Sequence, residues 1–142
     1  MKNLFILILA FLTICPIALS DNCIECHKEW EDDDGPSFIY SRDIHFQKNL
    51  GCADCHGGDT SADDMDEVRL AKNYRGIPDF NEIPDFCASC HSDADYMRQH
   101  NPSLPIDQLS KYKTSVHGQL LFGKNDNKVA TCISCHTIHE IG

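Results

Sequence analysis

A five-residue pattern, Cys-x-x-Cys-His, occurs four times in this chain and constrains its fold more than any other feature. Two thiols at this spacing can add to the two vinyl groups of a porphyrin, and the histidine that follows reaches the iron from one face. The pattern therefore predicts four haem c groups, each attached by two thioether bonds. The thioether cysteines are Cys23, Cys26, Cys52, Cys55, Cys87, Cys90, Cys132 and Cys135, and the proximal iron ligands are His27, His56, His91 and His136.

Zinc binding and a disulfide framework are alternative interpretations of cysteines that occur in pairs. Neither of them requires a histidine directly after each second cysteine, whereas attachment of haem c does. The chain has eight histidines, and half of them occupy this one position. We therefore favour haem and keep zinc and disulfides as open alternatives.

The remaining four histidines equal the number of distal ligands that four haem irons need. They are His45, His100, His117 and His139. A single histidine is more often a surface or packing residue than a ligand, but the match in number favours two histidines on every iron. Met97 is the rival distal ligand, because methionine is a known axial ligand of haem. Gly118, directly after His117, is interpreted as a point where the backbone approaches a porphyrin face.

The position of His139 restricts which haem it can serve. It lies three residues after His136, and the two axial ligands of one iron bind opposite faces of the ring. We therefore expect His139 to bind the iron of a different haem, which would bring two haems close together. For His45, His100 and His117 the sequence does not define the pairing.

Residues 1–20 have the features of a secretory signal peptide: Lys2 near the start, an apolar run at 4–14 and small residues at the exit. An uncleaved anchor is the weaker interpretation, because the apolar run is too short to span a bilayer comfortably. We expect one domain at 21–142 with no stable transmembrane segment after cleavage. Export would place it in the periplasm, at the cell surface or outside the cell.

The chain is acidic, with 22 acidic and 12 basic residues and a formal net charge of -10. Such a charge argues against nucleic acid as a partner and suits basic partners or charge-screened self-association. We expect the partners to be other redox proteins or extracellular electron acceptors.

The segments between the cysteines are poor in Leu, Ile and Val and rich in Asp, Gly, Pro and Asn, so an ordinary apolar core would be thin. Helices are expected at 61–74, 84–100 and 105–116, and no alternating run predicts a substantial sheet. The expected fold class is mostly coil with short α-helices and little or no sheet, a small multihaem cytochrome fold organised around four closely packed haems. Closely spaced haem edges would allow rapid electron hopping.

The motifs resemble those of multihaem c-type cytochromes of the cytochrome c3-like, doubled-CXXCH kind, over essentially all of 21–142. Within 87–141, the runs CASCH, SVHG and CISCHTIH look like tetrahaem modules of respiratory cytochromes. They also look like tetrahaem cytochromes that polymerise into extracellular filaments. The resemblance to the filament proteins implies haems in alternating parallel-stacked and T-shaped contacts, and a distal histidine supplied across a subunit boundary.

The predicted function is electron transfer, without catalysis, because two histidines on every iron leave no exchangeable position. One alternative is a subunit of a polymeric extracellular filament that conducts electrons over long distance through end-to-end haem contacts. Another alternative is a multihaem redox enzyme, such as one that converts nitrite or hydroxylamine. That enzyme would need an open iron position, which the histidine count argues against.

Overall fold

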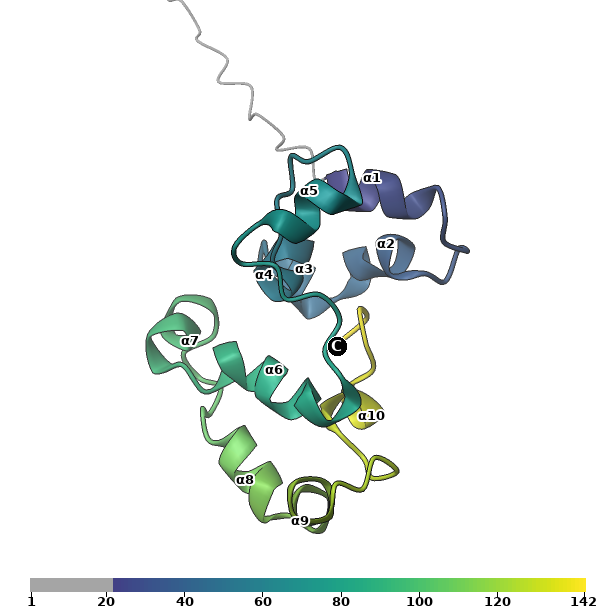
Figure 1. The fold of residues 1–142 in the computed structure, drawn as a ribbon. Helices are drawn as coiled ribbons and strands as arrows, with labels where there is room; N and C mark the ends of the chain where they lie inside the picture. The colour runs from purple at the N-terminus through teal and green to yellow at the C-terminus, as the bar shows by residue number, and fades with distance from the viewer. Residues whose placement is uncertain (1–21) are drawn as a thin grey trace, which may run out of the picture.

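The computed structural model describes residues 22–142, and within this range the chain forms short helices joined by turns and coil, with no strand (Figure 1). The helices are α1 (Asn22–Lys28), α2 (Pro36–Ile39), η1 (Tyr40–Arg42), α3 (Ile44–Gln47), α4 (Cys52–His56), α5 (Met65–Leu70), η2 (Phe80–Glu82), α6 (Ile83–His91), α7 (Ala94–His100), α8 (Gln108–Thr114), α9 (Val116–Lys124) and α10 (Cys132–His136). This architecture confirms the expected fold class of short helices and coil. The predicted signal peptide at 1–20 lies outside the described residues.

The helices gather in two groups along the chain (Figure 1). One group holds α1 to α5, and the other holds α6 to α10, in which α6 packs against α7, α8 and α10. The final residues return from α10 to the first group, where the amide of Ile44 donates to the carbonyl of Ile141 over 2.8 Å. The C-terminal segment therefore joins the two groups.

The apolar core of the described residues is thin. Its buried apolar side chains are Tyr40, Ala62, Ile83, Met97 and Leu121. Large apolar side chains elsewhere are open to solvent, and Trp30, Leu70 and Ile77 are 70%, 83% and 90% exposed. So few buried side chains cannot by themselves stabilise a domain of this length. We therefore expect another group to contribute to the core. In the described residues no helix is long and apolar enough to cross a membrane.

Polar caps make the helices shorter than the sequence pattern predicts. The helix expected at 61–74 is only α5, because Asp64 caps it by accepting from the amides of Asp66 and Glu67 over 2.7 and 3.1 Å. The helix expected at 84–100 is two helices, because Asp93 accepts from the amides that begin α7. Local capping therefore shortens or divides helices that the hydrophobic periodicity alone predicts to be continuous.

The helix expected at 105–116 corresponds to α8, and a separate helix, α9, follows it at once. Ser115 ends α8 and caps α9 by accepting from the amide of Gly118 over 3.1 Å. Gly118 is buried inside α9, where an added Cβ would lie 2.0 Å from the carbonyl oxygen of Tyr112. This glycine lets α8 and α9 approach each other, whereas the predicted contact with a porphyrin stays a prediction.

Candidate functional site

Each Cys-x-x-Cys-His motif forms a turn of α-helix, in α1, α4, α6 and α10. In α4, Cys52, Cys55 and His56 stand at positions i, i+3 and i+4, so the three side chains share one face of the helix. The same spacing holds in the other three motifs. Every motif therefore presents two thiols and one imidazole to the same side, as attachment of a haem and ligation of its iron require.

Residues between the cysteines help to start two of these helices. The Asp54 carboxylate accepts from the amide of Gly51 over 2.6 Å, and the Ser134 hydroxyl accepts from the amide of Thr131 over 3.0 Å. Both side chains satisfy an amide at the helix N-terminus that has no partner within the helix. The variable positions of the motif thus stabilise the turn that aligns its cysteines.

The second, third and fourth motifs lie close together through their sulfur atoms. The thiols of Cys87 and Cys132 interact with each other, and this interaction raises the pKa of Cys87 and lowers the pKa of Cys132 to about 7. Burial and then the nearby Cys90 raise the pKa of Cys55. Haem attachment would replace these thiols by thioethers, which carry no proton. These interactions indicate that Cys87 lies near Cys132 and that Cys55 lies near Cys90.

Two pairs of histidines face each other across long stretches of sequence. The ring centroids of His45 and His91 are 5.9 Å apart, and those of His56 and His139 are also 5.9 Å apart. Two imidazoles on opposite faces of one iron, each with a metal–nitrogen bond of about 2 Å, have centroids roughly 6 Å apart. Each pair therefore has the separation that an iron between its two rings requires.

The angles between the paired rings are compatible with the same arrangement. They are 79° for His45 and His91 and 41° for His56 and His139. Axial imidazoles stand perpendicular to the porphyrin, but each can rotate about its iron–nitrogen bond, so the angle between the two rings is free. Burial, and then the partner imidazole, lower the pKa of His91 and of His139. A lower pKa favours the neutral ring, which is the form that binds a metal.

Three of the candidate ligands have their Nδ1 atom engaged by an acceptor. The Nδ1 atoms of His27, His45 and His56 lie 2.7 Å from Glu31 Oε1, 2.8 Å from Asp43 Oδ1 and 2.9 Å from the Gly76 carbonyl oxygen. A ring that donates from Nδ1 keeps the lone pair of Nε2 for a metal, and metal-binding histidines usually have such a partner. The residues present therefore fit haem iron.

Tyr40 adjoins the pair formed by His56 and His139. Its ring lies 6.4 Å from that of His139 in an edge-on contact, and its hydroxyl donates to the carbonyl of Leu50 over 2.8 Å. Burial, and then the nearby Cys55, raise the pKa of the Tyr40 hydroxyl. Tyr40 thus lies between the C-terminal segment and the second motif.

The other two predicted distal ligands are placed differently. The His100 ring lies 4.5 Å from the ring of Tyr96, one turn earlier in α7. His117 is exposed at the start of α9. Within residues 22–142, neither ring forms a contact with His27 or His136 like those of the other two pairs. Met97, the rival ligand, is 6% exposed and belongs to the apolar core of the second helix group.

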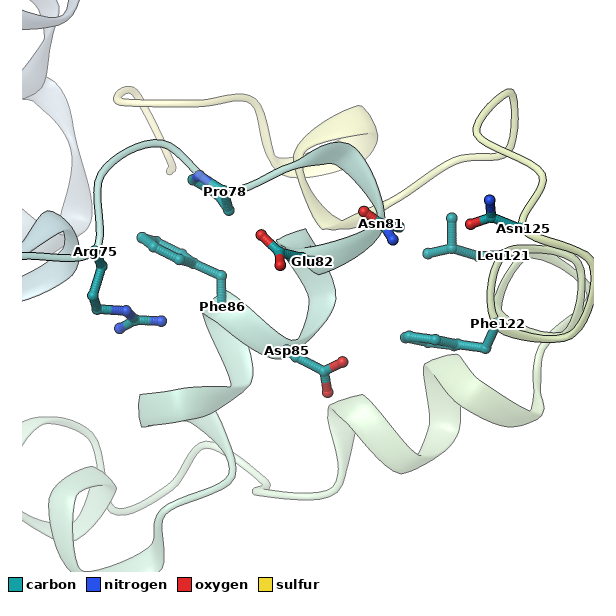
Figure 2. A pocket seen from close by; sticks show the side chains of 9 residues that line it. All are labelled: Arg75, Pro78, Asn81, Glu82, Asp85, Phe86, Leu121, Phe122 and Asn125. Atoms are coloured by element: carbon teal, nitrogen blue, oxygen red, sulfur yellow. The ribbon is translucent and has the colours of Figure 1, made fainter.

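A hollow of about 580 Å³ lies between α6 and α9 (Figure 2). Its lining contains none of the motif cysteines or histidines. The Arg75 guanidinium lies over the Phe86 ring at 4.2 Å, and that ring is 5.7 Å from the ring of His56. Phe86 therefore lies between this hollow and the pair formed by His56 and His139.

Sequence reasoning missed the acceptors of the imidazoles. Two of them leave a detectable signal: Asp43 lies two residues before His45, and Glu31 lies one helical turn after His27. The third acceptor, the carbonyl of Gly76, leaves none, because a chain turn with positive φ at Gly76 brings it to His56.

Comparison with known proteins supports the same kind of site. The family described as Cytochrome c3 matches residues 44–141. The chain is 29% identical over 121 residues to the C-type polyheme cytochrome OmcC of Geobacter sulfurreducens. The similar region covers 83% of this chain and 14% of the Geobacter protein. No solved structure matches the chain.

Proposed function

This chain belongs to the cytochrome c3 family, and we propose that it carries electrons through four haem c groups, each ligated by two histidines. The family match confirms the resemblance expected from the motifs. Electron transfer by a multihaem c-type cytochrome follows from that membership and from the polyheme relative. The number of haems, their ligands and the pairing of those ligands are our proposal.

The observation that carries the proposal is the separation of the two histidine pairs. We assign His139 as the distal ligand of the haem held by Cys52 and Cys55, opposite His56. We assign His45 as the distal ligand of the haem held by Cys87 and Cys90, opposite His91. When bound, haem supplies an iron that gains and loses one electron while both imidazoles stay in place.

The chain would hold the haems close together by crossing its own segments. His139 follows the fourth motif and reaches the second, whereas His45 precedes the second motif and reaches the third. Adjoining sulfur atoms link the third motif to the second and fourth. These crossings favour short gaps between neighbouring haem edges, which fast electron transfer needs.

We propose a carrier without catalytic activity, because paired histidines close both axial positions of an iron. We also propose that residues 1–20 are removed on export and that 21–142 form the tetrahaem domain. Its partners would then be redox proteins or electron acceptors of the periplasm, the cell surface or the extracellular space. The acidic surface favours partners with a basic docking surface.

A polymeric filament is the second candidate, and the placement of two histidines favours it. His27 belongs to α1 in the first helix group, whereas His100 ends α7 and His117 lies in the first turn of α9 in the second group (Figure 1). One of these two could ligate the iron opposite His136 in the same copy. We propose that the other ligates the iron opposite His27 of a neighbouring copy, which would continue the row of haems between subunits.

Mass spectrometry of the matured, exported protein tests the proposed function. We expect the mass of the chain from Asp21 plus four haems, with all eight motif cysteines blocked as thioethers. Three or fewer haems in a fully matured sample, with the remaining cysteines reactive toward a thiol reagent, would reject the tetrahaem proposal.

A further inference from the structure

We propose that Asp43 is a positioning residue for two haem ligands at once, since it binds His45 through one carboxylate oxygen and the segment that carries His139 through the other. This inference rests on the proposed haem ligation. It assigns to one buried side chain the relative placement of the haems at Cys52–His56 and Cys87–His91.

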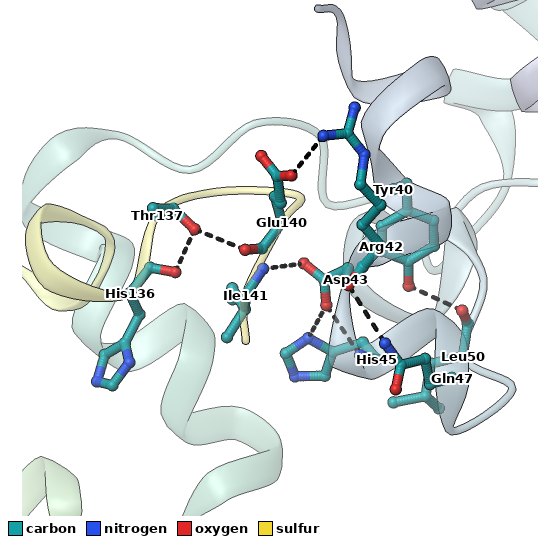
Figure 3. A network of polar contacts seen from close by, with 10 residues as sticks. All are labelled: Tyr40, Arg42, Asp43, His45, Gln47, Leu50, His136, Thr137, Glu140 and Ile141. Atoms are coloured by element: carbon teal, nitrogen blue, oxygen red, sulfur yellow. Dashed lines mark hydrogen bonds and ion pairs between the residues drawn. The ribbon is translucent and has the colours of Figure 1, made fainter.

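The Asp43 side chain has a partner on each oxygen (Figure 3). Its Oδ1 accepts from the amide and from Nδ1 of His45, both over 2.8 Å, and its Oδ2 accepts from the amide of Ile141 over 2.9 Å. Asp43 is only 1% exposed. A buried carboxylate is costly unless such donors compensate it, so this arrangement is specific.

The bond to His45 sets both the orientation and the electron density of that imidazole. His45 donates from Nδ1 to Asp43, which leaves Nε2 to face the iron opposite His91. A carboxylate acceptor makes the imidazole a stronger donor to the metal. A stronger donor stabilises the ferric iron, so Asp43 should lower the reduction potential of this haem relative to a variant without the charge.

The bond to Ile141 fixes the segment on which His139 lies. Ile141 donates to Asp43 and accepts from the amide of Ile44 over 2.8 Å, so one residue is held from both sides. Thr137 and His139 have φ values of 65° and 57°, a region that residues other than glycine rarely adopt. External contacts are needed to keep such a backbone in place, and the bond from Ile141 to Asp43 supplies one two residues after His139.

A surface ion pair ties the same two segments and provides a matched control. Arg42 Nη1 lies 2.7 Å from Glu140 Oε1, with the two side chains 61% and 43% exposed. Exposed pairs of this kind contribute little to stability. Glu140→Gln removes the ionic part of this tie while leaving the Asp43 contacts intact, so it separates a general weakening of the contact between the two segments from the specific effect of Asp43.

The test compares the matured protein with its Asp43→Asn and Glu140→Gln variants, by haem-resolved reduction potentials and by electron paramagnetic resonance. Asp43→Asn keeps the shape but loses the charge and one acceptor. We expect the potential of the His45 haem to rise and the low-spin signal of the His139 haem to shift or broaden, with the other two haems unchanged. Glu140→Gln should leave all four haems as in the parent.

Unchanged haem potentials and spectra in Asp43→Asn, or equal changes in Glu140→Gln, would overturn the inference.

Hydrogen exchange of the parent protein gives a second test if the variant does not mature. The amide of Ile141 should be protected although it lies outside every helix of the described residues, and rapid exchange there would reject the tether. A parent without two-histidine ligation would instead reject the proposed function, so the two failures are distinguishable.

Discussion

The ring of His139 lies 5.9 Å from the ring of His56, although His139 follows the fourth motif by only three residues. His56 belongs to the second motif, more than eighty residues earlier in the chain. The C-terminal segment therefore crosses from the second helix group to the first and places an imidazole beside His56. This crossing gives the first prediction.

Replacing His139 by Ala should open the haem held by Cys52 and Cys55 while leaving its attachment intact. One iron of the four should become high-spin, bind carbon monoxide and gain peroxidase-like activity, because a single axial position has lost its imidazole. Absorption spectra with and without carbon monoxide measure this change. Ile138→Ala, at a neighbouring side chain that is 54% exposed, should retain the parent spectrum. A His139→Ala protein with no spin change would show that His139 is not a ligand.

Replacing His45 by Ala should open a different haem, the one held by Cys87 and Cys90. The double variant with His139→Ala should then have about twice the high-spin fraction of either single variant, since each substitution uncaps a separate iron. Titration with carbon monoxide counts the open irons. A double variant with the same high-spin fraction as one single variant would show that both histidines serve the same iron.

Gly118 should be required for the contact between α8 and α9. An alanine Cβ at this position would meet the Tyr112 carbonyl at 2.0 Å, and overpacking of this kind costs about 1–3 kcal/mol. Gly123, in the same helix, has no atom within 4 Å of an added Cβ. Gly123→Ala should stabilise the protein by roughly 0.5–1 kcal/mol, because alanine is the better helix former. Thermal unfolding of the two variants should show shifts of opposite sign, and a stable Gly118→Ala protein would contradict the packing described here.

The assembly state should be coupled to one iron. If one distal histidine comes from a neighbouring copy, negative-stain microscopy should show polymers, and dissociating them should convert one iron of the four to high spin. Sedimentation and absorption spectra measured on the same samples test this link. A monomer with four six-coordinate irons over a wide range of concentration would reject the filament candidate.

The sequence predicted those features that depend on local spacing. The motifs identify the cysteines and proximal histidines as candidate haem-binding residues. The absence of alternating runs predicted little or no sheet, and the described residues contain no strand. One sequence does not reveal whether Asp64 and Asp93 cap new helices or lie within longer ones. The helices were therefore predicted too long. Competition between a side-chain cap and a continuous helix is decided by small energy differences.

Pairing and support of the ligands could not be predicted, because they depend on contacts between distant residues. The Asp43 carboxylate meets the Ile141 amide across 98 positions of the chain. His45 lies seven residues before the second motif, yet its ring faces His91 of the third. Contacts between residues so far apart in the sequence can be identified only when the path of the backbone is known.

An experimental structure of the matured, haem-loaded protein tests the central claim most directly, since it shows the two axial ligands of every iron. We predict one iron between His45 and His91, at the haem attached to Cys87 and Cys90. We predict a second iron between His56 and His139, at the haem attached to Cys52 and Cys55. An open axial position at either iron, or a ligand other than His45 and His139 in these places, would contradict the proposed ligation.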